Sequence, residues 1–301
     1  MDCKFALSRG ARTRLINAYV AEREGFFEQE GLNVAMSLMR WNVARDDPTI
    51  DFQLRDNLEV IPDIARGVGV KMIASEINTL FYELVTLPEI KSVEGLKGKT
   101  LAIGSSGDIP DMLIEGIMGT QGFKHPNDYS LITIGLGYER VAALKAKKIH
   151  GTCVSPPSNF MLEDEGFNIL VGVDKVRGSL RNMAYSGLYA RDEFAKENPE
   201  AVKAVIRAFL KANKFIAENR ERTVRCMVEA AEVDESIAEK SYDMLMRAGG
   251  FSPDGRPSLE AVKANIDWMV SKGQLSANLP QKLYDPNTYV DLRFLPNPTK
   301  R

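Results

Sequence analysis

The sequence predicts an α/β fold with largely parallel sheets. Short apolar runs of strand length alternate with longer segments of helical periodicity along much of the 301-residue chain, a rhythm typical of βαβ units. From Asp192 onward the pattern is helical. With 44% apolar and 27% charged residues, the composition is that of an ordinary globular protein with a sizeable core.

The individual elements follow from periodicity and from terminator residues. Residues 14–30 carry apolar positions at helical spacing and are followed by Gly31, and the shorter helical pattern at 57–66 is followed by Gly67. Strands are expected at residues 4–7, 32–39, 70–74, 81–86, 101–103, 130–134, 149–154 and 168–173. Helical segments are also expected at 92–96 (one turn), 108–121, 137–147, 199–219, 221–231, 235–248 and 258–272.

The C-terminal tail differs from the segments before it. Residues 279–301 are rich in Pro and Asn, which predicts an extended wrap over the surface with one helical turn.

Two strand-like crossings, at about residues 80–87 and 186–190, connect one group of βα elements to the next. They predict two lobes: a middle lobe of residues 88–185, and a discontinuous outer lobe of residues 1–87 plus 186–301. A single continuous α/β domain is the alternative that periodicity leaves open.

Composition and charge argue against several classes of function. Lys and Arg number 39 against 41 Asp and Glu, so the charge favours neither nucleic acid nor a membrane surface as partner. Cys3, Cys153 and Cys226 are far apart and form no Cys-x-x-Cys motif, which indicates neither a zinc site nor a disulfide framework. No apolar run has the length of a transmembrane span. We expect no cofactor, no metal and no transmembrane segment.

The first residues, from Met1 to Ser8, show neither the apolar core nor the cleavage site of an export signal. The expected location is periplasmic or extracellular if a signal peptide has been removed, and cytoplasmic otherwise.

Four stretches carry a resemblance to a known family. In the first, Ala21-Glu-Arg-Glu-Gly-Phe-Phe-Glu-Gln-Glu-Gly-Leu-Asn-Val34, a helix, a double aromatic and a glycine precede Leu-x-Val. This order resembles the opening of solute-binding proteins of the nitrate, taurine and sulfonate type, which serve ABC transporters and share their fold with fungal thiamine pyrimidine synthases. The similarity spans about residues 4–220, and its other stretches are 96–107, 140–157 and 190–200.

The resemblance implies a periplasmic-binding-protein fold of the second type, in which two lobes hold a ligand in a cleft and close by a hinge motion. It also implies two partners, a small organic ligand and an ABC permease. Residues 40–47 depart from the family because they are bulky and charged where small residues are usual. This departure leaves the type of ligand open.

Candidate binding residues lie in loops after strands, because open α/β sheets bind ligands outside the carboxyl ends of their strands. The loop that begins at Ser8 offers hydroxyl groups, backbone N–H groups and the guanidinium groups of Arg9 and Arg12 to an anion. A helix cap with solvated arginines is the alternative. Arg40 could neutralise charge in the same way, and Trp41 either offers flat apolar area to a ligand or packs within the protein.

A similar loop follows the strand at 101–103. Ser105, Ser106 and Gly107 are small enough for a ligand to approach the N–H groups at the start of the next helix, where the helix dipole favours negative charge. Alternatively, Ser106 or Asp108 simply caps that helix.

Four further candidates follow other strands or crossings. Asn57 begins the helix at 57–66, and Tyr138 and Ser155 each follow a strand, with Tyr138 equally able to be a packing residue. Asn182 lies just before the return crossing.

No catalytic set emerges from the sequence. His125 lies in a turn and His150 at the start of a strand, both typical of surface residues. There is no Gly-x-Ser-x-Gly motif, and no cysteine cluster matches the iron-binding motif of the pyrimidine synthases. We predict no catalytic residue, and the sequence leaves enzymatic activity undecided.

Three functions remain open at this stage. The first is a binding protein that captures a small organic anion, such as a sulfonate or carboxylate, for ABC-type uptake. The second is a cytoplasmic enzyme on the same fold that acts on a pyrimidine or an aromatic acid. The third is a ligand-sensing module for a partner protein, which the sequence does not distinguish from the first.

Overall fold

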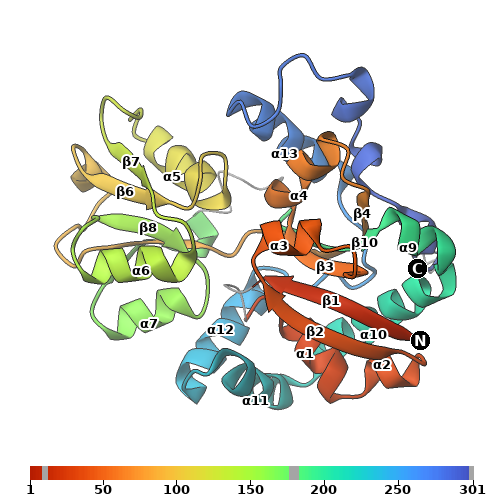
Figure 1. The fold of residues 1–301 in the computed structure, drawn as a ribbon. Coiled ribbons are helices and arrows are strands. Elements are labelled where there is room, and N and C mark those ends of the chain that lie inside the picture. The colour runs from red at the N-terminus through yellow and green to blue at the C-terminus, as the bar shows by residue number, and fades with distance from the viewer. Residues whose placement is uncertain (9–12, 176–182, 298–301) are drawn as a thin grey trace. The chain divides into compact units, whose positions relative to one another are not determined.

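The chain folds into two compact units, and the computed structural model describes residues 1–8, 13–175 and 183–297 of it. Unit 1 comprises Met1–Asn78, Asn182–Glu235 and Gly249–Arg301, and unit 2 comprises Thr79–Arg181 and Ser236–Ala248. Unit 1 is therefore discontinuous in sequence, and each unit is built around its own sheet (Figure 1).

Unit 1 contains a five-stranded sheet in the order β2-β1-β3-β10-β4. β1 pairs in parallel with β2 and β3, whereas β10 is antiparallel to both of its neighbours, β3 and β4. Ser186, the first residue of β10, therefore pairs with Asp56, the last residue of β3. The strands are β1 (Asp2–Ser8), β2 (Asn33–Met39), β3 (Phe52–Asp56), β4 (Val70–Ile77) and β10 (Ser186–Arg191).

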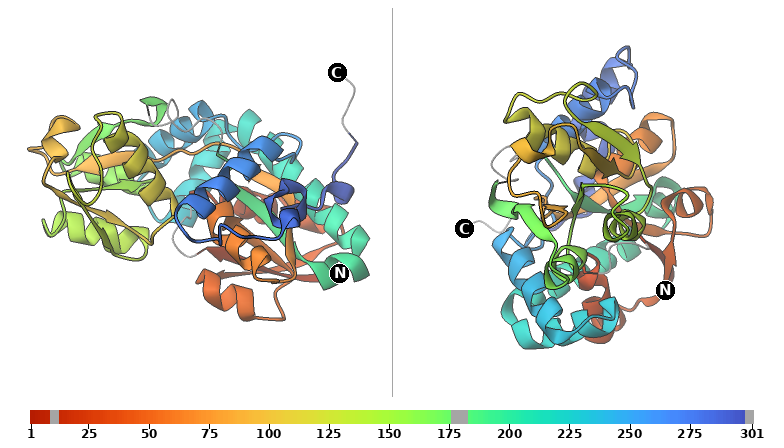
Figure 2. Two further views of the ribbon diagram at one scale, coloured as in Figure 1. Left: turned by 90° about the horizontal axis from the view of Figure 1, so that it is seen from above. Right: turned by 90° about the vertical axis from the view of Figure 1, so that its left-hand side faces the viewer.

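Helices cover both faces of this sheet (Figures 1 and 2). The chain moves from β1 to β2 in one direction across the sheet and from β3 to β4 in the other, so right-handed crossovers place α1 and α4 on opposite faces. α1 contacts α10, and α4 contacts α13. The helices are α1 (Ile16–Arg23), α2 (Phe26–Gln29), α3 (Trp41–Asp46), α4 (Asn57–Ala65), α9 (Asp192–Glu197), α10 (Pro199–Glu218), α11 (Arg220–Ala231) and α13 (Leu259–Ser271).

Aromatic side chains join the sheet of unit 1 to α2 and α10. The ring of Phe5 stacks on that of Phe52 at 4.8 Å between centroids, and Phe27 and Phe209 lie 5.7 and 6.0 Å from Phe5. Phe5 and Phe52 are fully buried. Burial of such rings is a major contribution to the core, and it explains why β1 reads so clearly as a strand in the sequence.

Several parts of unit 1 differ from the sequence prediction, and the helix α3 was not predicted. The single helix expected at 14–30 is broken into α1 and α2, because Gly25 adopts a left-handed conformation with φ +68° that interrupts the helix. β3 was not predicted, although Ile50, Phe52 and Leu54 alternate with polar residues as they do in a strand. The polar side chains of Gln53 and Arg55 are buried as well.

Unit 2 contains a second five-stranded sheet, in the order β7-β6-β8-β5-β9. β6 pairs in parallel with β7 and β8, and β5 is antiparallel to β8 and β9. Each sheet thus carries one antiparallel strand at the same relative position, and both sheets are largely parallel, as the sequence predicts. The elements are β5 (Glu83–Thr86), η1 (Glu94–Leu96), β6 (Thr100–Ile103), α5 (Ile109–Gly119), β7 (Ser130–Thr133), α6 (Gly137–Lys145), β8 (Gly151–Val154), α7 (Ser158–Asp164), β9 (Asn168–Val171) and α12 (Glu235–Arg247).

The unit boundaries differ from the expected lobe boundaries in two ways. The crossings fall between residues 78 and 79 and between 181 and 182, rather than between 87 and 88 and between 185 and 186. Residues 236–248, expected in the outer lobe, belong to unit 2. Lys240 of α12 accounts for part of this placement, because it bonds to Asp164 of α7 at 2.8 Å.

The tail packs more closely than the extended wrap that we predicted. It contains three 3-10 turns, η2 (Gln281–Tyr284), η3 (Pro286–Tyr289) and η4 (Leu292–Phe294). Tyr289 is buried, its hydroxyl donates to the Leu283 carbonyl at 2.8 Å, and the neighbouring Val290 forms a bridge with Met72 of β4. The tail therefore contributes to the core of unit 1.

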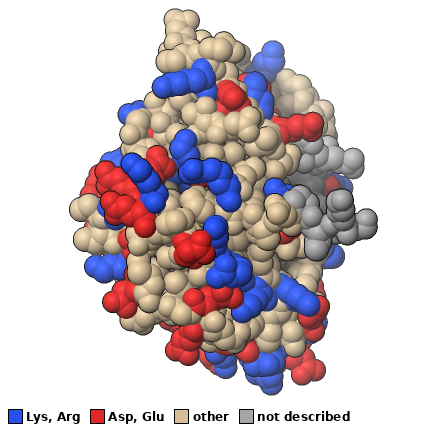
Figure 3. Space-filling model, turned by 90° about the vertical axis from the view of Figure 1, so that its right-hand side faces the viewer, with Lys and Arg blue, Asp and Glu red and all other residues tan. Residues whose placement is uncertain are grey.

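Charge is mixed on the surface of the chain. On the face drawn in Figure 3, Lys and Arg side chains are interspersed with Asp and Glu, in keeping with the balanced composition. No helix among the described residues combines the length and the hydropathy that crossing a membrane requires.

Candidate ligand-binding site

Three predicted site residues lie at one edge of the unit 1 sheet. β2, β1 and β3 are adjacent and parallel, so Ser8, Arg40 and Asn57, which end or follow these strands, share the edge at which the strands terminate. Ser8 is half-buried, and Arg40 is exposed at the N-terminus of α3.

Four other predictions fall partly or wholly outside the described residues. Arg9, Arg12 and Asn182 lie outside them altogether, and Trp41 is described only as the first residue of α3. Their binding roles remain predictions.

A buried charged cluster at the same edge was missed by the sequence analysis. It consists of Arg14, Asp56 and Glu76, and we refer to it as the Arg14 cluster. Arg14 Nη1 donates to Glu76 Oε2 at 2.9 Å, and Arg14 Nη2 lies 3.3 Å from Asp56 Oδ1. The side chains of Arg14 and Glu76 are 2% and 1% exposed, and that of Asp56 is 20% exposed. The guanidinium also lies over the ring of Tyr185, 5.5 Å from its centroid.

Burial perturbs both acids of the Arg14 cluster. Burial raises the pKa of Glu76 to about 7, although the charge of Arg14 and the hydroxyl of Ser186 oppose it. Burial also raises the pKa of Asp56, against the positive charges of Arg14 and Arg55. One guanidinium faces two carboxylates in a poorly hydrated place, so at least one carboxylate takes up a proton readily near neutral pH.

Asn57 is buried rather than open to solvent. It is 1% exposed, and its Oδ1 accepts a 2.5 Å hydrogen bond from the hydroxyl of Tyr189. Among the described residues, no acceptor bonds its Nδ2. Asn57 follows Asp56 directly in the chain, and its Nδ2 has no hydrogen-bond acceptor among the described residues.

In unit 2, the loop before α5 satisfies most of its own amide groups. Asp108 caps α5 by accepting from the amide of Asp111, as one of our two readings of the loop predicted. Its other carboxylate oxygen accepts from the amides of Gly104 and Ser105 at 2.8 and 2.9 Å, and Asp111 accepts from the amide of Gly107. These three amides are thus engaged by carboxylates of the protein itself.

The two serines of this loop are exposed, whereas Gly107 is buried. Burial raises the pKa of Asp108 to about 6, and the hydrogen bond from Asp111 and the charge of Arg140 oppose it. An anion in this loop would have to bind the hydroxyl groups of Ser105 and Ser106 rather than most of the amides, and would approach Asp108.

The other predicted residues of unit 2 lie nearby in sequence but differ in exposure. Tyr138 is 53% exposed on the first turn of α6, and Ser155 is half-buried after β8. Arg140, which the sequence analysis did not single out as a binding residue, is buried and donates to the Gly135 carbonyl at 2.6 Å and to Thr152 Oγ1 at 3.1 Å. Arg140 therefore fixes the loop that precedes α6.

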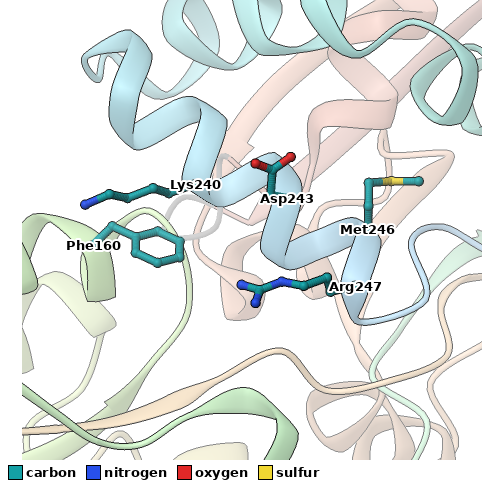
Figure 4. Close-up of a pocket in the computed structure, with 5 residues that line it drawn as sticks. All are labelled: Phe160, Lys240, Asp243, Met246 and Arg247. Carbon is teal, nitrogen blue, oxygen red and sulfur yellow. The ribbon is translucent and has the colours of Figure 1, made fainter.

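A cavity of about 600 Å³ opens within unit 2, away from these residues (Figure 4). Its lining comes from α7 and α12, and none of the predicted site residues takes part. The ammonium group of Lys240 lies 5.8 Å from the centroid of the Phe160 ring and also pairs with Asp164. The lining residues are Phe160, Lys240, Asp243, Met246 and Arg247.

The groups that most often perform catalysis have structural partners here. His125 Nδ1 lies 3.1 Å from the Tyr129 carbonyl, and His150 Nδ1 accepts from the Thr100 amide at 3.2 Å. The cysteines are buried, and burial raises the pKa of the Cys3 thiol to about 11, which disfavours the reactive thiolate. The described residues hold no group of three His, Cys, Asp or Glu side chains arranged to bind a metal ion.

Comparison with known proteins decides the family. Residues 12–223 match the family model described as NMT1/THI5 like. The chain belongs to the NMT1/THI5-like family. This confirms the resemblance drawn from the sequence, and the two five-stranded sheets agree with the periplasmic-binding-protein fold expected from it.

Two curated relatives illustrate the range of the NMT1/THI5-like family. A putative ABC transporter periplasmic binding protein of Brachyspira hyodysenteriae is 26% identical over 212 residues, covering 66% of this chain and 59% of the relative. A 4-amino-5-hydroxymethyl-2-methylpyrimidine phosphate synthase of Saccharomyces cerevisiae is 25% identical over 220 residues, covering 67% of this chain and 63% of the enzyme. The chain thus spans about three fifths of the length of these relatives.

A solved structure shows the same fold over nearly the whole chain. The periplasmic aliphatic sulphonate binding protein of Escherichia coli superposes with a TM-score of 0.77 at 15% identity, covering 96% of this chain and 92% of that protein. At this identity the likeness establishes the fold.

Proposed function

We propose that this protein is a solute-binding protein that captures a small organic anion, a sulfonate or carboxylate, for ABC-type uptake. The observation that carries the proposal is that Ser8 and Arg40 end or follow two adjacent parallel strands of unit 1, β1 and β2, at the same end of the sheet. Ligands of open α/β sheets bind at such edges. A guanidinium and a hydroxyl there suit a sulfonate or carboxylate group.

The family supports binding rather than catalysis as the main function. One relative is named as a periplasmic binding protein, and the sulphonate binding protein shares the fold. In keeping with this, we place the protein in the periplasm and assign it an ABC permease as partner. The histidines and thiols of the described residues are engaged or buried, so they do not favour an acid–base or nucleophilic mechanism.

Isothermal titration calorimetry tests the proposal. The panel should contain ethanesulfonate, taurine, nitrate, benzoate and an uncharged pyrimidine. We expect at least one organic anion to bind, and Arg40→Gln to weaken its binding by about tenfold to a hundredfold, since a charge-assisted hydrogen bond contributes about 1.5–3 kcal/mol. Arg23→Gln is the matched control, because Arg23 is an exposed arginine of α1 paired with Glu229. Binding of only neutral or cationic compounds would contradict the assignment of an anion.

The second candidate function is an enzyme of pyrimidine metabolism, which the Saccharomyces relatives favour. The same panel of compounds distinguishes an enzyme from a binding protein. Mass spectrometry of each compound after prolonged incubation with the protein should show the compound unchanged if the protein only binds it. A new product that accumulates with protein concentration would favour the enzyme.

A further inference from the structure

The Arg14 cluster lies at the end of the unit 1 sheet where the proposed anion site lies. Resting on the proposed function, we propose that capture of the anion is coupled to the uptake of a proton by the Arg14 cluster. Asp56 or Glu76 takes up this proton when the anion binds. The protein would therefore bind its ligand more tightly as the pH falls.

The register of the strands brings Asp56 next to the anion site. Leu7 of β1 pairs with Leu54 of β3, so Ser8, the last residue of β1, lies one residue short of Asp56, the last residue of β3. Neighbouring strands are about 4.8 Å apart, which puts the backbones of Ser8 and Asp56 roughly 6 Å apart. Asp56 also has the exposed part of the cluster, 20% of its side chain. An anion bound at Ser8 is therefore close enough to repel the carboxylate of Asp56.

Glu76 is linked to Asp56 along the same edge. Ser186 of β10 pairs with Asp56 on one side and with Ile77 of β4, the residue after Glu76, on the other. Arg14 joins the two acids, because its guanidinium donates to Glu76 at 2.9 Å and lies 3.3 Å from Asp56. The negative charge of Asp56 also acts on Glu76. A proton on either acid therefore changes the charge of the whole cluster.

The balance of charge makes the Arg14 cluster ready to take up a proton. Its single guanidinium, that of Arg14, faces two carboxylates, and two carboxylates in one poorly hydrated place do not ionise together easily. Arg55 adds positive charge near Asp56, but Asp63 and Glu59 share its guanidinium at 3.1 and 3.8 Å. An anion nearby increases the repulsion, and a proton relieves it.

Uncharged groups complete the surroundings of the two acids. The hydroxyl of Ser186 faces Glu76, and the ring of Tyr185 lies against the guanidinium of Arg14. The hydroxyl of Tyr189 donates to Asn57, and burial raises the pKa of Tyr189 well above its ordinary value of 10. These groups do not titrate near neutral pH, so the proton would reside on the acids.

The direction of the pH dependence follows from the state of the cluster without ligand. Burial raises the pKa of Glu76 to about 7, so the cluster holds a proton at about pH 6 and has lost it at about pH 8. An anion meets little repulsion from the protonated cluster and more from the ionised one. Affinity should therefore be highest below about pH 7 and decline as the pH rises through this value.

Coulomb's law gives the size of the effect. At an effective dielectric constant of about 20, two unit negative charges about 8 Å apart repel each other enough to weaken binding more than tenfold. Water and salt reach the partly exposed Asp56 and screen part of this repulsion. We expect the affinity to fall about fivefold between about pH 6 and about pH 8.

Calorimetry of the full chain with ethanesulfonate and with benzoate tests the coupling. Both compounds stay ionised from about pH 6 to about pH 8, so a proton that is exchanged belongs to the protein. Cationic buffers such as Tris and Bis-Tris avoid competition from sulfonate buffers. At least one compound should show the fivefold loss of affinity. Mixing that compound with the protein in unbuffered solution at about pH 7 should raise the pH, by uptake of about half a proton for each ligand bound.

Two isosteric variants assign the effect to the Arg14 cluster. Glu76→Gln and Asp56→Asn each remove the second negative charge, so each should bind the anion at about pH 8 as tightly as the wild type does at about pH 6, within about twofold. A damaged fold would not produce this gain of affinity. Glu30→Gln is the matched control, because Glu30 pairs with Arg207 and Lys211, and it should keep the pH dependence of the wild type.

The outcomes separate this inference from the proposed function. An anion that binds equally well at about pH 6 and about pH 8, without proton uptake, would overturn the inference and leave the proposed function standing. Affinity that rises with pH, or a pH dependence that survives in both variants, would also overturn the inference. Binding of no organic anion at any of these pH values would overturn the proposed function and the inference together.

Discussion

The raised pKa of Glu76 makes the stability of unit 1 depend on pH. Burial raises the pKa from the ordinary value of 4.5 to about 7, with Arg14 and Ser186 opposing. Between these two values the folded protein holds a proton that the unfolded chain has released. The stability associated with Glu76 is therefore fully present below about pH 4.5 and is lost as the pH rises through about 7. One pKa unit corresponds to about 1.4 kcal/mol, so full ionisation lowers the free energy of unfolding by about 3 kcal/mol.

Glu76→Gln should remove this pH dependence. The free energy of unfolding of the variant minus that of the wild type should rise by about 2–3 kcal/mol between about pH 5 and about pH 8. The variant thus becomes more stable relative to the wild type as the pH rises. Urea unfolding followed by fluorescence at several pH values measures the difference. A difference between the two proteins that stays constant over this range would refute the reasoning.

Glu30→Gln provides the control in the same unit. Burial raises the pKa of Glu30, but the bonds from Lys211 and Arg207 outweigh burial and hold the pKa below 4.5. Glu30 is therefore ionised throughout the range in both the folded and the unfolded chain. The difference between this variant and the wild type should be the same at every pH from about 5 to about 8.

Two further predictions concern buried polar contacts of unit 1. Asp63 is fully buried and accepts hydrogen bonds from Arg55 at 3.1 Å and from Arg66 at 2.5 Å. Asp63→Asn removes the negative charge that compensates the buried guanidinium of Arg55. The variant should therefore lose roughly 3 kcal/mol of unfolding free energy, measured by urea unfolding. Tyr189→Phe leaves the buried Asn57 Oδ1 without its donor and should lower the free energy of unfolding by about 1–2 kcal/mol. An unchanged free energy of unfolding in either variant would argue against the corresponding contact.

The sequence predicts the strands whose side chains are apolar, and it fails where buried side chains are polar. The apolar run Phe5-Ala6-Leu7 marks β1 in the sequence, and in the structure Phe5 of this run packs against other rings. β3 is buried as well, but Gln53 donates to the Ala44 carbonyl and Arg55 bonds to Asp63, so its interior contacts are hydrogen bonds. The apolar residues Ile50, Phe52 and Leu54 alternate with polar ones, so this strand carries a period-2 signal, and a search for continuous apolar runs misses it.

The Arg14 cluster could not be predicted from the sequence for a related reason. Arg14 and Glu76 are 62 positions apart, and only the pairing of β1, β3, β10 and β4 brings the ends of their segments to one edge. One signal was present in the sequence: the charged Glu76 follows closely after the apolar run Met72-Ile73-Ala74 of a predicted strand. A charge in that position requires a partner, but a single sequence does not say which arginine supplies it.

The loop at residues 104–108 shows how a binding motif can be occupied by its own neighbours. Small residues before a helix predict free amides for an anion, yet Asp108 and Asp111 accept the amides of Gly104, Ser105 and Gly107. The carboxylate of Asp108 that caps α5, together with that of Asp111, therefore occupies the amides that an anion would need. A helix N-terminus preceded by small residues thus offers free amides to a ligand only where no acidic side chain of the first turn accepts them first.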